Sequence, residues 1–377
     1  MKQEKQTLPN RQSQAYTILS IIAISGELPT KQISRLPGGR EYKNKLIKNL
    51  KRKNLIHTYY KDKLRGHKLT ANGKTILLEN NPERFEVFLT GNTETNQPKY
   101  EITRRLRLQS IAETVVTMQN AGVSIYRDEK PDVFCSDIDI TAFPYTITEP
   151  AFYNSREIKY LGSEFVKIRG ARSVGSLITE HEAFIVYNTG GSLMKWDYRS
   201  EFRTKALIKN ILCIERFPHQ YKPDNIRGMM LGDNMAQLYT LLTSTGGVKK
   251  KYFMLDDNYG SFIYLTNDHN GELILKLLCD RDKTTHLNYI LTENLSECDP
   301  GMLIENDAVD DNGDPVLFVY DCDMPRIKRF NTALNICNRT GTIICFDFQS
   351  EVLRRYCCEN VKFQTIDIKK FEGRFFP

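Results

Sequence analysis

The sequence predicts an α+β protein, with a small helical N-terminal domain and one β-hairpin ahead of a larger α/β region. Two patterns predict this fold class. Between residues 13 and 53 apolar residues recur at steps of three and four, and an alternating segment with a charged turn follows. Beyond residue 100, strand-like and helix-like segments alternate. The 377 residues are enough for two or three domains of about 100 to 150 residues each.

We expect four parts: a basic N-terminal domain (1–80), a polar linker (81–99), a central α+β domain (100–217) and a C-terminal α/β domain (218–377). The linker is expected because residues 80–98 are rich in Asn, Thr, Gly and Pro.

The bulk composition excludes several classes of protein. No apolar run approaches the roughly 18 residues of a membrane helix, and the N-terminus has no signal-peptide pattern, so we expect a cytoplasmic protein without membrane contact. The nine cysteines have no zinc-knuckle spacing, so reduced thiols, including the adjacent Cys357 and Cys358, are expected. We therefore expect no metal, no cofactor and no catalytic residue.

The charge is concentrated at the N-terminus. Residues 1–80 hold 17 Lys and Arg against 5 acidic residues, a balance of +12, whereas the whole chain carries only +7. Such a domain attracts a polyanion. The domain lacks a lysine-rich amphipathic helix with an aromatic face, so nucleic acid is favoured over a membrane surface.

Three helices are expected within the basic domain. The first spans Ser13–Ser25 and ends at Gly26, and the second runs from Pro29 and Thr30 to Leu36. After the turn at residues 37–39, the third spans about residues 41–53 and has two faces. Its expected buried face consists of Tyr42, Leu46, Ile47 and Leu50, and its expected exposed face of Lys43, Asn44, Lys48, Lys51 and Arg52.

A hairpin is expected next, with strands at residues 55–60 and 67–69 around a charged loop at residues 61–66. Thr70 is the expected N-cap of a last helix that ends near Glu79. Three helices with a basic hairpin form a winged helix-turn-helix domain, whose third helix would enter the major groove of double-stranded DNA. The residues expected to contact DNA are Arg40, Lys43, Asn44, Lys45, Lys48, Lys51, Arg52, Lys61, Lys63 and Arg65.

In the central domain, Arg104, Arg105 and Arg107 precede an amphipathic helix at about residues 106–121. These arginines either extend the DNA contact or form a solvated helix start. An antiparallel meander is expected over residues 174–196, covered by a helix at about residues 200–213.

A nuclease alternative rests on two short motifs. Asp132 after Pro131, with Glu157 and Lys159 in a Glu-x-Lys motif, resembles the magnesium-binding signature of one nuclease superfamily. Motifs this short also occur by chance. The pair Asp137 and Asp139 alternates with isoleucines and reads better as the solvent face of a strand.

In the final third, residues 228–242 are interpreted as a loop and a helix, and Lys249–Lys251 as a basic turn that either contacts DNA or is simply solvated. No phosphate-loop motif is present. Residues 316–366 alternate strand, helix, strand, helix, strand, a Rossmann-like βαβ pattern with parallel strands. Asp321, Asp323 and Asp347 follow these strands, where they cap helices or bind a metal.

The Leu69-Thr70-Ala-Asn-Gly73 motif after the hairpin, with residues 173–177 and 186–190, resembles the replication-relaxation-like proteins of Gram-positive plasmids and integrative elements. The resemblance implies an accessory role in replication or transfer of a mobile genetic element, with recruitment of the replication or transfer machinery. A transcription regulator with a C-terminal sensing or dimerisation domain, and a Mg²⁺-dependent DNA nuclease, remain the alternatives. Whether a homodimer binds DNA stays open.

Overall fold

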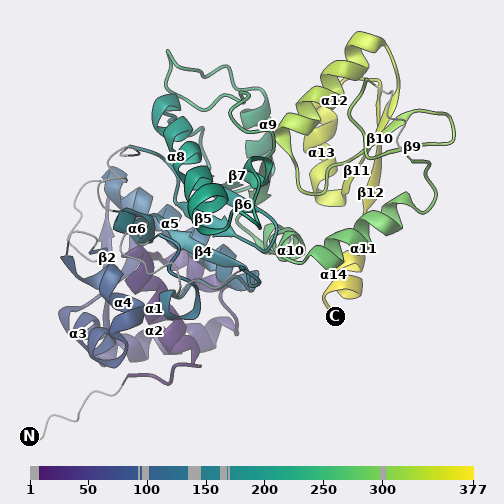
Figure 1. The fold of residues 1–377 in the computed structure, drawn as a ribbon. Helices are drawn as coiled ribbons and strands as arrows, with labels where there is room; N and C mark the ends of the chain where they lie inside the picture. Colours follow the sequence, from purple (N-terminus) through teal and green to yellow (C-terminus); the bar gives the residue numbers. More distant parts are fainter. Residues whose placement is uncertain are drawn as a thin grey trace, which may run out of the picture. The chain divides into compact units, whose positions relative to one another are not determined.

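The computed structural model combines helices with several sheets, and its described part contains no barrel (Figure 1). The expected α+β class is thereby confirmed at this level. The chain divides into two compact units: unit 1 comprises Met1–Val166 and Val174–Ile178, and unit 2 comprises Lys167–Ser173 and Thr179–Pro377. The residues that the structure describes are 8–91, 94, 95, 102–134, 146–161, 168, 170–297 and 303–377.

Helices and short strands make up unit 1. Its elements are α1 (Gln14–Ser25), β1 (Leu28–Pro29), η1 (Thr30–Arg35), α2 (Arg40–Arg52), β2 (Ile56–Lys61), β3 (Leu64–Leu69), α3 (Ala71–Asn80), α4 (Pro82–Leu89), α5 (Ile102–Asn120), η3 (Arg127–Glu129), β4 (Ala151–Asn154), α6 (Ser155–Ile158), η5 (Lys159–Leu161) and β5 (Gly175–Ile178).

Alternating strands and helices make up unit 2. Its elements are β6 (Ala183–Gly190), α8 (Tyr198–Asn210), the π-helical turn η6 (Ile211–Arg216), η7 (Pro223–Asn225), β7 (Ile226–Gly232), α9 (Ala236–Leu242), β8 (Phe262–Thr266), α10 (His269–Leu278), α11 (Arg281–Thr292), β9 (Ala308–Val309), β10 (Pro315–Phe318), α12 (Met324–Cys337), β11 (Gly341–Phe346), α13 (Asp347–Tyr356), β12 (Val361–Ile366) and α14 (Ile368–Phe375).

Helix α1 is the centre of unit 1. The Ser13 hydroxyl accepts a hydrogen bond from the Tyr16 N–H at its start, and Gly26 ends it in the left-handed conformation, with φ of 86°. Its residues are buried nearly all round, rather than on the one face that the sequence predicts. The reason is tertiary, because α4 and α5 both pack against it.

The hairpin closes more tightly than expected. Strands β2 and β3 pair without a gap from Ile56↔Leu69 to Lys61↔Leu64, so only Asp62 and Lys63 form the turn. Both have positive φ, of 53° and 61°, which is typical of the type I′ turns that match the twist of paired strands. Strand β1 adds to the other edge of β3 and completes a sheet in the order β1-β3-β2. The Thr70 N-cap of α3 is confirmed, because its hydroxyl accepts from the Gly73 N–H at 3.0 Å.

Part of the expected polar linker is helix α4. The Asn81 side chain caps this helix by accepting from the Arg84 N–H, and Phe85 and Phe88 are fully buried in unit 1. Arg84 also pairs with Asp128, with 2.6 Å between Nε and Oδ1. A linker over these residues is therefore wrong, since Phe85 and Phe88, three residues apart on a helix, supply a buried face. Residues 92, 93 and 96–99 of the expected linker lie outside the described part.

In unit 2, β6, β7 and β8 are parallel neighbours. The meander expected over residues 174–196 is wrong in its last strand, because Lys195 contributes only an isolated bridge to Tyr252. Residues 228–232, interpreted as part of a loop, belong to the buried strand β7. Gly228 belongs in that strand because the Phe262 ring occupies its side-chain position, 2.5 Å from where a Cβ would lie.

A buried polar network joins α8 to the β6 strand. The Tyr187 hydroxyl donates to Glu201 at 3.0 Å and lies 3.0 Å from the Tyr259 hydroxyl. The second Glu201 oxygen accepts from the Arg172 N–H at 2.7 Å. Burial raises the pKa of the Glu201 carboxyl to about 7. The Glu201 carboxyl therefore stays protonated in the folded chain at pH values at which an exposed glutamate has lost its proton.

The alternation expected near the C-terminus is confirmed as parallel strands joined by helices. Strand β11 pairs in parallel with β10 and with β12, and α12 and α13 form the two connections. The boundaries expected near residues 99 and 217 differ from the division into units. The reason is that α5, β4 and β5 belong with the N-terminal helices in unit 1.

Candidate nucleic-acid interface

Unit 1 carries a concave surface of about 570 Å³ between η1, α2 and β3, which we call the α2 groove. Five exposed residues that were expected to contact DNA line it. They are Arg40, Asn44, Lys48, Lys51 and Arg65. No Asp or Glu stands among the described residues that line it. The groove is therefore a cationic surface that is not neutralised by acidic side chains of its own lining.

Helix α2 presents this surface, but Tyr42 and Lys43 exchange the exposed and buried positions that the sequence predicts. Lys43 is buried at 8% exposure, and its ammonium group donates to the carbonyls of Ser34 and Leu36 at 2.8 and 2.9 Å. These carbonyls lie at the end of η1, where backbone acceptors lack partners within the helix. Lys43 therefore secures η1 against α2, and its ammonium group is engaged within unit 1.

Tyr42, expected on the buried face, is 48% exposed. Its ring lies over Gly38, which has φ of 97°, and comes within 2.9 Å of where a Cβ of Gly38 would lie. The spacing could have revealed the exchange, because position 43 is seven residues before the buried Leu50 and lies on the same helix face. The sequence nevertheless predicted an exposed Lys43, because a charged side chain is ordinarily expected on the solvent face of a helix.

His67 lies in the wall of the α2 groove and was missed by the sequence analysis. Its ring nitrogens lie 3.2 Å from the Thr58 hydroxyl and 3.4 Å from the Thr30 hydroxyl. Burial, reinforced by Lys51 and Arg65, lowers the pKa of His67 to about 4. The ring is therefore neutral at pH 7 and adds no charge to the groove.

The β2–β3 hairpin carries exposed cations next to this surface. Lys61, Lys63 and Arg65 are exposed around the two-residue turn. The remaining expected contacts, Lys45 and Arg52, are exposed on α2 outside the groove lining, and Arg52 donates to the Asn49 side chain at 3.1 Å. Nine of the ten expected residues are thus exposed, and Lys43 is the exception.

A buried ion pair holds the hairpin in place. Arg105 and Glu27 are both fully buried, with 2.6 Å between Nη2 and Oε1. The Arg105 guanidinium also donates to the carbonyls of Lys61 and Leu64, at 2.8 and 3.2 Å, on either side of the turn. Burial would raise the pKa of Glu27, but hydrogen bonds from Arg105 and Gln109 hold it below its usual value. Arg105 is thus a positioning residue of unit 1, and neither expectation for it, DNA contact or solvated start, describes it.

The residues of the nuclease motif have other partners. Glu157 is buried, pairs with the Lys130 ammonium at 2.9 Å and accepts from the Asn154 N–H at 2.8 Å as part of the cap of α6. Asp132 pairs with Arg127. No group of three or more His, Cys, Asp or Glu side chains within the described residues is arranged to hold a metal ion. Asp137 and Asp139 lie outside the described part.

The aspartates near the C-terminal strands have separate positions. Asp323 caps α12, and Asp347 is the first residue of α13, where it accepts from the Phe348 N–H. Asp321 alone lines a cavity, which is described below. Seven cysteines are in the described part without disulfides, and burial raises the pKa of Cys357 to about 12.

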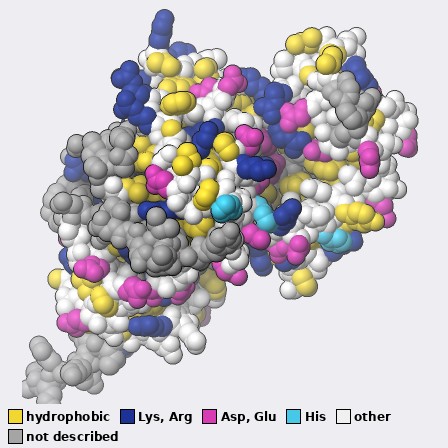
Figure 2. All heavy atoms as spheres, in the orientation of Figure 1, with side chains coloured by type: hydrophobic (Ala, Val, Ile, Leu, Met, Phe, Trp, Pro, Cys, Tyr) yellow, Lys and Arg dark blue, Asp and Glu magenta, His cyan; other side chains and the backbone are white. Residues whose placement is uncertain are grey.

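Unit 2 has its own exposed basic turn at Lys249–Lys251, and Figure 2 shows Lys and Arg side chains projecting at several places on the visible face.

In comparisons with protein-family models, curated proteins and solved structures, nothing matches the chain. Among the described helices, none is both long and apolar enough to span a bilayer.

Proposed function

We propose that the chain is a sequence-specific double-stranded DNA-binding protein, with the α2 groove and the β2–β3 hairpin as its contact surface. The observation that carries the proposal is the exposed cationic lining of the groove, without an acid among its described residues. Lysine and arginine side chains that are free of acidic partners release counterions when they meet phosphates. An amide such as that of Asn44, among these cations, is a group that reads adenine in the major groove.

The order of elements supports a winged helix-turn-helix interpretation of residues 13–80. Helix α1, strand β1, the short η1, helix α2 and the β2–β3 hairpin follow one another, and the sheet has the order β1-β3-β2. In this interpretation α2 is the recognition helix and the hairpin is the wing. Arg105 then fixes the wing to α5 and to Glu27 through the two carbonyls beside the turn and the buried ion pair.

The biological role that we propose is an accessory one in the replication or transfer of a mobile genetic element, in the cytoplasm. It rests on the resemblance described above for the Leu69–Gly73 motif. Selection of bound sequences from random duplex DNA tests this role, because an origin or transfer-region binder should recover one defined site. Recovery of random sequences would leave only non-specific binding.

The contact surface itself is tested by charge reversal in the full chain. Lys48→Glu with Lys51→Glu should weaken binding to duplex DNA by about a hundredfold or more, because two phosphate contacts become two repulsions. The matched control is Lys369→Glu with Lys370→Glu on α14, which makes the same change of charge in unit 2. Fluorescence anisotropy measures both, and equal affinities of the two double variants would refute the proposed surface.

A further inference from the structure

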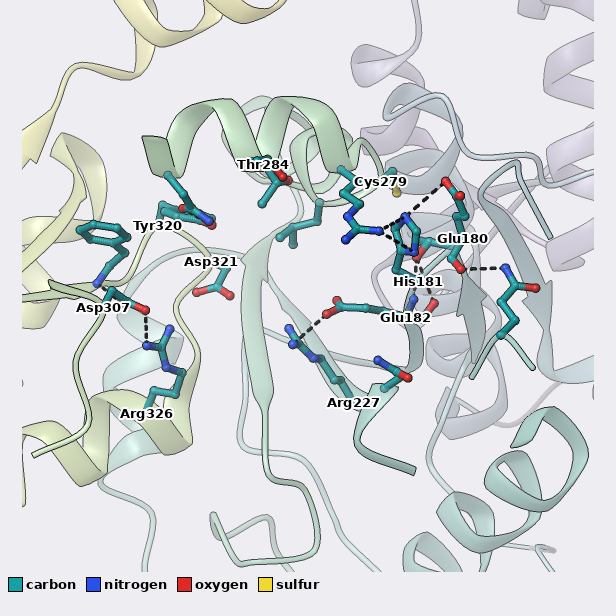
Figure 3. Close-up of a pocket in the computed structure, with 18 residues that line it drawn as sticks. Glu180, His181, Glu182, Arg227, Cys279, Thr284, Asp307, Tyr320, Asp321 and Arg326 are labelled. Carbon is teal, nitrogen blue, oxygen red and sulfur yellow. Dashed lines mark hydrogen bonds and ion pairs between the residues drawn. The ribbon is translucent and has the colours of Figure 1, made fainter. Parts of the chain in front are cut away.

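Unit 2 contains a cavity of about 540 Å³ that plays no part in the proposed DNA contact, and we call it the Asp321 pocket. Its walls come from the turn before β6, the start of β7, helices α10 and α11, and the segment after β10 (Figure 3). This volume falls within the range of about 300 to 1,000 Å³ that is typical of small-molecule sites.

Two arginines in the pocket are already paired. Arg227 contacts Glu182 with 2.7 Å between Nη2 and Oε1, and Arg326 contacts Asp307 with 2.7 Å between Nη2 and Oδ1. A ligand would have to break these pairs in order to use either charge. The two ion pairs are therefore electrically neutral parts of the pocket wall with fixed hydrogen-bonding groups.

Asp321 differs from the other acids of the pocket. Its carboxylate lies between the two ion pairs and has no dashed contact in Figure 3. One oxygen accepts from the Asp323 N–H at 3.2 Å, and no Lys, Arg or His of the described part forms an ion pair with it. Burial and the neighbouring Asp323 raise the pKa of Asp321 to about 7. The pocket thus holds a carboxyl group without a direct ion pair, which Arg326 and Arg227, both paired with other acids, influence only from a distance.

The opposite charge without an acidic partner is at the start of α11. Arg281 lines the pocket, is exposed, and forms no ion pair with an acid of the described part. Its Nη1 lies 3.3 Å from His181 Nε2, and the same ring nitrogen lies 3.3 Å from Glu180 Oε2. The pocket therefore offers Asp321, an acid without a direct ion pair, and Arg281, an exposed arginine that reaches the Glu180 carboxylate only through His181.

We propose that the Asp321 pocket binds a small zwitterion such as an amino acid, with the ligand's ammonium group on Asp321 and its carboxylate on Arg281. Each end forms a charge-assisted hydrogen bond, which is stronger than a neutral one. The aromatic ring of Tyr320 is fixed beside Asp321, because its hydroxyl donates to Asn288 at 3.0 Å. Its preformed position reduces the entropy lost on binding.

Calorimetric titration of the full chain at pH 8 with matched probes tests the proposal. The probes are 4-aminobutyrate with putrescine and succinate, and 6-aminohexanoate with 1,6-diaminohexane and adipate. Within each set, chain length is constant and only the end groups change. At least one zwitterion should bind about tenfold or more tightly than its diamine and its diacid. Absence of detectable binding by both zwitterions, or equal binding of the diamine, would overturn the proposal.

Two substitutions assign the ends of the ligand. Asp321→Asn keeps the shape of the side chain, and Arg281→Gln changes an exposed position. Each substitution should lower the affinity for the zwitterion about tenfold or more. The control Asp311→Asn, an exposed acid outside the pocket, should bind as the unchanged chain does. Unchanged affinity of Asp321→Asn with intact circular dichroism would overturn the proposal, and if that variant unfolds, Arg281→Gln decides in the same way. The titration contains no DNA, so its result is independent of the proposed function.

Discussion

The α2 groove and the Asp321 pocket both contain basic side chains, but these side chains face different partners. In the groove, Lys48 and Lys51 stand exposed without an acid among the described lining residues. In the pocket, Arg227 and Arg326 face carboxylates at 2.7 Å. Unpaired cations on an open surface attract a large polyanion from a distance, whereas paired ones shape a site for a small molecule. The arrangement of charges, rather than their number, thus separates the two proposed sites.

A second contrast concerns burial of the ion pairs in the two units, and it predicts the largest effect. Arg105→Ala removes the bidentate partner of the fully buried Glu27 and leaves it only Lys68, at 3.3 Å, and the Gln109 amide, so it should lower the free energy of unfolding by about 3 kcal/mol. Arg227→Ala breaks a pair whose members are 32% and 24% exposed, and it should cost about 1 kcal/mol or less. Urea unfolding of both variants makes the comparison. Equal losses would show that burial does not distinguish the pairs.

The raised pKa of Glu201 predicts that the free energy of unfolding depends on pH, with an effect of similar size. Its pKa is about 7 in the folded chain against the usual 4.5, so the folded state binds the extra proton between these values. Its contribution is present below pH 4.5 and is lost as the pH rises to about 7, for a total of about 3 kcal/mol. Glu201→Gln should remove this pH dependence in unfolding experiments. An unchanged slope between these pH values would contradict the buried network.

Lys43 and Lys45 are neighbours on α2 with different expected roles. Lys43→Ala leaves two carbonyls of the η1 end without a donor and should cost about 1 to 3 kcal/mol of stability. Lys45→Ala should change stability by less than about 0.5 kcal/mol, because the side chain is exposed. Thermal unfolding separates them. A stable Lys43→Ala variant would mean that its two hydrogen bonds do not matter.

The hairpin tip should give the smallest effect. Lys63→Ala should weaken DNA binding by only about threefold to tenfold, because one phosphate contact at the rim is lost. Stability should stay unchanged, since Lys63 is exposed in the turn. Anisotropy with the same duplex measures this, and a loss as large as that of the Lys48 and Lys51 double variant would move the main contact from the groove to the hairpin.

Local signals were the part of the fold that the sequence could predict. The end of the first helix at Gly26, the cap at Thr70 and the alternating strands and helices after residue 315 depend on neighbouring residues, and the structure agrees with them. Errors arose where a distant segment decides. Gly228 belongs in a strand only because the Phe262 ring covers it, and α4 is a helix of the core through Phe85 and Phe88.

The two sites show the same limit. Exposed residues of the α2 groove lie close together in the sequence and could be proposed from charge and helix period, except Lys43. The Asp321 pocket brings together residues from the segments around 181, 227, 281 and 321. No local sequence pattern predicts that Asp321 lacks a direct ion pair, because its ion pairing depends on which arginines the folded chain brings near it.

The salt dependence of DNA binding tests the central claim most directly. For the full chain and a duplex, the logarithm of the affinity should fall linearly with the logarithm of salt concentration. In Lys48→Ala with Lys51→Ala, the slope should become shallower by about 2, one unit for each lost phosphate contact. A chain that ignores duplex DNA in dilute buffer, or a double variant with an unchanged slope, would contradict the account.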